Sequence, residues 1–139
     1  MAEPIGLVSG PLALATFALQ SSITLRNTIQ SFQFHPKRVR DLIEELEALN
    51  EVLGLLTKTV SAAVDVDLSP LHLPLLRCGN SCKDFGQEII KCSSWSGGSL
   101  TSFRDWAKLR YVGEDIDGFR RVLAGYRLTI SIALADANL

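Results

Sequence analysis

Apolar residues recur every three or four positions along three long stretches of the chain, a spacing typical of amphipathic helices. The clearest stretch covers residues 36–60, where polar side chains occupy the other faces. Two more stretches with the same spacing cover residues 71–92 and 116–133, so we predict three long helices that share one core. Their apolar positions are Val39, Leu42, Leu46, Leu49, Leu53, Leu56 and Val60; Leu71, Leu75, Cys78, Cys82, Phe85, Ile89 and Cys92; and Ile116, Phe119, Leu123, Tyr126, Ile130 and Ala133.

The amino-terminal stretch, residues 4–25, contains no charged side chain and would reach roughly 33 Å as a helix, about the thickness of a hydrocarbon core. Glycine, serine, threonine and glutamine interrupt its apolar residues, so it makes a marginal membrane span at best. We predict a helix with Ser9 as N-cap and Pro11 in its first turn, continuing to about Phe32. Residues 1–8 precede it as a loosely held apolar arm.

Serine, proline and glycine set the remaining boundaries. Ser69 and Pro70 mark the start of the third helix, while residues 93–99, with two consecutive glycines, indicate a loop. A shorter helix is expected over residues 101–111, closed by Gly113.

No run of alternating apolar and polar residues stands out as a strand, so the predicted fold class is all-α. Short connections favour a four- or five-helix bundle of antiparallel neighbours, in which the first helix packs its apolar side against the other three seams. With 47% apolar residues, a chain of 139 residues suits a single domain over residues 1–139.

The charge balance argues against nucleic acid as a partner. Fourteen basic and fifteen acidic side chains give a formal charge of −1, which provides no positive field for a phosphate backbone. The three cysteines, an odd number, fit a reducing compartment, and the opening residues lack the cationic region of a secretory signal. We expect a cytoplasmic protein.

The residues offer no catalytic or metal chemistry. His35 and His72 lie at no spacing from cysteine or carboxylate that is typical of zinc, and the nucleophile-elbow, phosphate-loop and dinucleotide motifs are absent from the sequence. The three cysteines fall on a seam, where cysteine packs as a small hydrophobe. We therefore expect no enzyme activity, no cofactor and no metal.

A few residues outside the seams are candidates for contact with a membrane or partner. Lys37, Arg38 and Arg40 form a small basic cluster after the first helix, which could touch anionic headgroups although nearby acidic residues offset its charge. Trp95 is either an exposed contact residue or a packed one, whereas the spacing of Trp106 favours the core. The amino-terminal stretch is either the most buried helix of the bundle or a segment stored there and later exposed.

Three stretches of the chain carry a resemblance to a known family. They are residues 1–10 (MAEPIGLVSG), residues 36–53 (PKRVRDLIEELEALNEVL) and residues 126–137 (YRLTISIALADA). The chain resembles the HeLo-like amino-terminal domain of fungal STAND (NLR-like) proteins, and is similar to the amino-terminal domain of an azaphilone-pigment cluster protein. The resemblance spans nearly the whole chain and implies a HeLo-like helical bundle.

The resemblance also implies a function in regulated cell death during fungal incompatibility. A helical effector of this type heads a larger receptor, whose downstream domains oligomerise it, and an amino-terminal helix then moves from the cytoplasm to damage the plasma membrane. In this chain the executing segment would be residues 1–25. Its candidate lipid-facing residues are Ile5, Leu7, Val8, Leu12, Leu14, Phe17 and Leu19.

Two hypotheses follow. The first is a membrane-targeting cell-death effector that is held in the bundle until neighbouring receptor domains cluster it, so that several apolar arms act together on membrane lipid. The second is a non-lytic module that forms homo-oligomers, a dimer or larger, or docks a partner protein through an exposed apolar face. An enzyme of pigment biosynthesis would need a polar pocket with perturbed acids, for which no residues can be named.

Overall fold

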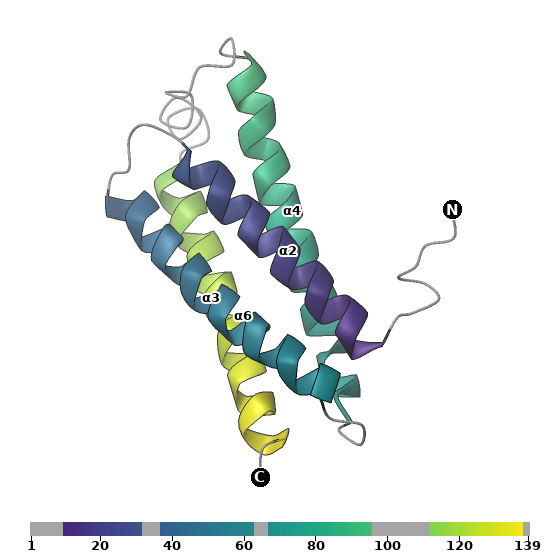
Figure 1. Cartoon of the computed structure of the whole chain (residues 1–139). Helices are drawn as coiled ribbons and strands as arrows, with labels where there is room; N and C mark the ends of the chain where they lie inside the picture. The colour runs from purple at the N-terminus through teal and green to yellow at the C-terminus, as the bar shows by residue number, and fades with distance from the viewer. Residues whose placement is uncertain (1–9, 32–36, 63–66, 96–111, 138–139) are drawn as a thin grey trace, which may run out of the picture.

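The computed structural model describes residues 10–31, 37–62, 67–95 and 112–137, with the backbone alone for 91–95, 112–115 and 137 (Figure 1). Its elements are α2 (Pro11–Gln30), α3 (Lys37–Ala62), the short 3₁₀ helix η1 (Ser69–Leu71), α4 (His72–Trp95) and α6 (Val112–Ala137). Within these ranges the chain is helical and contains no strand. The predicted all-α bundle is confirmed.

Helix boundaries follow the predicted signals to within a few residues, with three corrections. α4 continues to Trp95, so residues 93–95 are helical rather than part of the loop predicted over residues 93–99. The N-cap of α2 is Gly10 rather than Ser9, in an extended conformation before Pro11, whose fixed φ suits the first helical position. Gly113 does not close a short helix; it lies in the first turn of α6, where glycine is tolerated because the turn has few intrahelical bonds to lose. The predicted helix over residues 101–111 lies outside the described residues.

The start of η1 is held by the side chain of Asp67. One carboxylate oxygen of Asp67 accepts hydrogen bonds from the backbone N–H of Ser69, at 3.1 Å, and from its hydroxyl, at 2.6 Å. These bonds lower the pKa of Asp67. The chain therefore enters η1 and α4 through a turn that the Asp67 side chain holds at the predicted Ser69–Pro70 boundary.

The four long helices alternate in direction, and α2 lies between α3 and α4 (Figure 1). Extensive contacts join α2 to α4, α2 to α3, and α3 to α6, whereas α4 and α6 touch at few places. The first helix therefore packs on two seams, those of α3 and α4, rather than on all three. Because α2 and α4 run in the same direction, as do α3 and α6, two of the three extensive contacts join parallel neighbours, and the predicted antiparallel arrangement holds only for α2 with α3 among them.

The core lies along the predicted seams. Cys78 and Cys82 are buried as expected, and the rings of Phe85 and Phe119 stack with centroids 4.1 Å apart. Among the side chains that the structure describes, the central helix α3 contributes more buried ones than any other helix, namely Val39, Leu42, Ile43, Leu46, Leu49, Leu53 and Leu56.

Ion pairs connect α3 to both of its neighbours. Arg127 of α6 donates to Glu45 from Nε at 2.5 Å, and Arg26 of α2 donates to Glu47 at 2.7 Å. The Glu45 carboxylate is 12% exposed, and its hydrogen bond raises the pKa of Arg127. The pair on the α6 side is therefore better shielded from water than the pair on the α2 side, whose side chains are 34% and 48% exposed.

Candidate functional site

The inner face of α2 belongs to the core, which decides what the rest of the helix can do. Its buried residues follow helical spacing and are Leu14, Ala15, Ala18, Ser22, Leu25 and Ile29. The other faces of α2 carry hydroxyl and amide side chains together with the exposed apolar residues Leu12 and Ile23. Any site on α2 is therefore built from these hydroxyl and amide groups and from the apolar side chains at the edge of the core.

Glycines on α4 bring α2 close to that helix. A Cβ added to Gly79 would overlap the ring of Phe17, so the ring packs directly against the α4 backbone. Seven residues further on, a Cβ at Gly86 would make an ordinary 3.6 Å contact with Leu25. The two contacts advance together along both helices, as expected for parallel neighbours.

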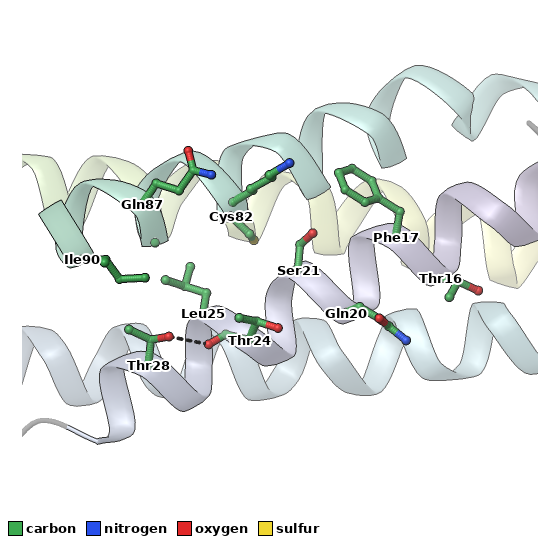
Figure 2. Close-up of a pocket in the computed structure, with 12 residues that line it drawn as sticks. Thr16, Phe17, Gln20, Ser21, Thr24, Leu25, Thr28, Cys82, Gln87 and Ile90 are labelled. Carbon is green, nitrogen blue, oxygen red and sulfur yellow. Dashed lines mark hydrogen bonds between the residues drawn. The ribbon is translucent and has the colours of Figure 1, made fainter. Parts of the chain in front are cut away.

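Beside these contacts, α2 and α4 enclose an open groove of about 420 Å³ (Figure 2). Its apolar lining includes Leu25 and Cys82, which are nearly inaccessible to water, with Phe17 toward one end and Ile90 toward the other. Ile90 is 55% exposed. The polar lining consists of Thr16, Gln20, Ser21, Thr24, Thr28, Lys83 and Gln87.

The electrostatics of the groove are simple. Lys83 is the single charged residue of its lining, and it makes no ion pair with another described residue. A hydrogen bond with Cys78, together with burial, raises the pKa of the Cys82 thiol. A thiol that stays protonated is a poor nucleophile, so Cys82 is poorly suited to covalent chemistry.

The predicted lipid-facing residues do not share one surface. Ile5, Leu7 and Val8 lie outside the described residues. Of the rest, Leu14 is buried in the core and Leu19 is half-buried against it. Phe17 lines the groove, and Leu12 is 42% exposed.

The predicted basic cluster lies at the other end of α2. Lys37, Arg38 and Arg40 occupy the first turn of α3, next to the end of α2 rather than its start (Figure 1). Lys37 pairs with Asp41 at 3.0 Å, and Arg38 lies 3.9 Å from Asp117 of α6. Leu12 is thus separated from the cluster by nearly the whole of α2. Trp95 ends α4, and its side chain and those of His35 and Trp106 lie outside what the structure describes.

None of the described helices combines the length and the apolar content needed to cross a bilayer. This finding agrees with the prediction that the amino-terminal stretch makes a marginal membrane span at best.

The groove was not foreseen in the sequence, although a signal for it exists. Gly79, Cys82 and Gly86 place small residues on one face of α4 at the three- and four-residue spacing that permits close helix contact. The apolar spacing places Cys82 in the core but does not show which neighbouring helix packs beside these small residues.

Comparison with known proteins identifies the family of the chain. The model of the family described as the amino-terminal region of the pigment biosynthesis cluster protein PigL matches residues 2–139, and the chain belongs to this family. No curated protein and no solved structure matches it.

Proposed function

We propose that this member of the PigL amino-terminal family is a non-enzymatic interaction domain that binds an amphipathic helix of a partner protein in the α2–α4 groove. The observation that carries the proposal is the groove itself, an open apolar channel with hydroxyl and amide edges between two parallel helices. Helices commonly bind such grooves by inserting apolar side chains at i, i+3 or i+4.

The charge of the groove defines the partner further. Lys83 stands alone at the edge, so a carboxylate one turn from the inserted apolar residues would pair with it. Thr24 and Gln20 offer hydrogen bonds along the opposite edge. The proposed partner is therefore an apolar helix with an acidic residue on one side of its binding face.

The packing of α2 favours docking on this helix over its release. Withdrawing α2 would expose the large side chains Leu14, Leu25 and Ile29, each worth about 1.5–3 kcal/mol when fully buried. Ala15 and Ala18 would be exposed as well. Binding in the groove leaves all of these contacts in place.

The test is a selection of helical peptides displayed against the purified full chain. We expect the enriched peptides to carry spaced apolar residues with an acidic residue beside them. Thr24→Trp covers the groove from an exposed position and should weaken their binding at least about tenfold, whereas Gln30→Trp, outside the groove, should not.

Reversing the charge of Lys83 provides a second test of peptide binding in the groove. Lys83→Glu should weaken the same peptides about tenfold, and exchanging the peptide's acid for lysine should restore binding. Arg77→Glu, an exposed position on α4 outside the groove, is the matched control. Peptides that bind the Thr24→Trp protein as tightly as the unchanged chain would rule out the groove as the docking site.

A second candidate is the membrane-targeting cell-death effector, with the domain clustered by the downstream parts of an NLR-like receptor. It is supported by the absence of charged side chains between Pro4 and Leu25 and by the resemblance to HeLo-like domains. In this case the free energy lost when the apolar side chains of α2 leave the core is regained when they enter lipid.

The experiment uses forced clustering of the chain on a trimeric fusion, with leakage of phosphatidylserine vesicles as the readout. A deletion of residues 1–25 would remove Leu14, Ala15, Ala18, Ser22 and Leu25 from the core, so the matched variant lacks only residues 1–9. The candidate predicts leakage with the intact chain and its loss in the shortened chain. Equal leakage from both, or none from either, would count against it.

A further inference from the structure

One face of α6 is left uncovered by the other described helices. The helix turns Leu123, Ile130 and Leu134 into the core, and Arg127 reaches back to Glu45 of α3. The exposed residues on the other side form what we call the outer face of α6. They are Arg121, Val122, Gly125, Leu128, Thr129, Ile132, Ala135 and Asp136.

The outer face is unusually apolar for an exposed helix surface. Val122 is 46% exposed, Leu128 60% and Ile132 56%, and no charged side chain lies on this face between Arg121 and Asp136. Neither of these two end residues makes an ion pair with another described residue. Contiguous exposed apolar surface of this kind marks an interaction site.

The order of residues on the outer face is self-complementary. If a second α6 is laid against it in the antiparallel direction, with the two-fold axis between Leu128 and Thr129, every residue of the face comes to the same height along the helix as another residue of the same set. A large side chain then shares its layer with a small one in each apolar pair, and a cation shares its layer with an anion at each end. The facing pairs are Arg121 with Asp136, Val122 with Ala135, Gly125 with Ile132, and Leu128 with Thr129.

We propose that the outer face of α6 is a homodimer interface, occupied by the same face of a second copy of this chain in antiparallel alignment. An isologous contact about a two-fold axis requires this kind of self-complementarity. Gly125, where an added Cβ would meet open space, leaves room for Ile132 of the second copy. An unrelated partner would not require the charges to be placed symmetrically about the centre of the face.

The size of the face sets the strength of the dimer. Arg121 and Asp136 lie roughly 22 Å apart along the helix, so one helix face buries less than the ~800 Å² per partner of a standard interface. We therefore expect a weak dimer with a micromolar dissociation constant, which forms when the chains are concentrated.

The first test is sedimentation of the full chain over a range of concentrations. The unchanged chain should show a reversible monomer–dimer equilibrium, and Leu128→Asp should raise its dissociation constant at least about 100-fold by placing two carboxylates in the apolar contact. The matched control is Leu73→Asp on α4, which is 51% exposed and should leave the dimer intact. A chain that stays monomeric, or a dimer that tolerates Leu128→Asp, would overturn the proposal.

The second test addresses the alignment. Arg121→Asp and Asp136→Arg alone should each weaken self-association about tenfold, because each places like charges at both ends of the contact. A mixture of the two variants should associate again, since each chain then offers the charge that the other lacks. The double variant Arg121→Asp/Asp136→Arg should behave like the unchanged chain, and failure of both rescues would overturn the antiparallel register.

This interface is separate from the α2–α4 groove, and the two proposals can fail independently. Peptide binding to the Leu128→Asp chain tests the groove without the dimer, and sedimentation of the Thr24→Trp chain tests the dimer without the groove.

Discussion

The helices α2 and α6 both pack on α3, but they distribute their apolar side chains in opposite ways. Arg26 is the single charged residue of α2, whereas α6 has seven. Yet α2 buries most of its large apolar residues and leaves Leu12 and Ile23 only 42% and 39% exposed, apart from each other among hydroxyl and amide groups. In contrast, α6 leaves Val122, Leu128 and Ile132 46%, 60% and 56% exposed on one face. The placement of apolar residues around a helix, rather than their number, decides which helix is available for binding.

The largest expected effect of this difference is on the free energy of unfolding when one acidic residue is introduced into each helix. Ala18 of α2 is fully buried, so Ala18→Asp would bury an unpaired carboxylate and should lower the free energy of unfolding by about 4 kcal/mol or more. Leu128→Asp on α6 should change it by less than about 0.5 kcal/mol in dilute monomer. Urea unfolding measures both, and comparable losses would show that α6 is not exposed as described.

Glycine substitutions on α4 probe the α2 contact at two points. Gly79→Ala should lower the unfolding free energy by about 1–2 kcal/mol, because its Cβ overlaps the Phe17 ring. Gly86→Ala should raise it by about 0.5–1 kcal/mol, since its Cβ has room beside Leu25 and alanine favours the helix. In a Phe17→Leu background, thermal unfolding should show a smaller penalty for Gly79→Ala; an unchanged penalty would place its cause elsewhere.

The two ion pairs to α3 provide a finer comparison. Glu45→Ala should lower the unfolding free energy by about 1 kcal/mol, and Glu47→Ala by about half of that, because the first carboxylate is the more shielded. Both losses should shrink in 0.5 M salt, the second more completely. Equal losses at low and high salt would show that the removed side-chain packing, not charge, is responsible.

The smallest expected effect concerns Lys37 and Asp41 at the start of α3. The hydrogen bond from Lys37 lowers the pKa of Asp41 below its ordinary 3.8, so Lys37→Met should raise it, as measured by NMR titration. A lowered carboxylate pKa contributes stability above the unfolded value, and this contribution is lost as pH falls through the folded value. Arg40→Met, a more distant charge, should move the Asp41 pKa less.

The sequence was sufficient for the helices and much of the core, because the spacing of residues such as Leu42, Leu46 and Leu53 repeats a local rule that burial enforces. The sequence could not show that α2 packs against the seams of two helices, α3 and α4, rather than against all three. That choice depends on which neighbour has a gap, and the gap at Gly79 has meaning only against Phe17, 62 positions earlier in the sequence. The groove was missed for the same reason.

The contact of Phe17 with Gly79 also limits how α2 can move. Sliding α2 along α4 by one turn in either direction would bring the ring to the level of Leu75 or Lys83, which carry side chains where Gly79 has none. A one-turn ratchet between these helices therefore requires one of these side chains to move. Any rearrangement of α2 must lift the ring out of its notch before the helix can travel, which makes the step cooperative rather than gradual.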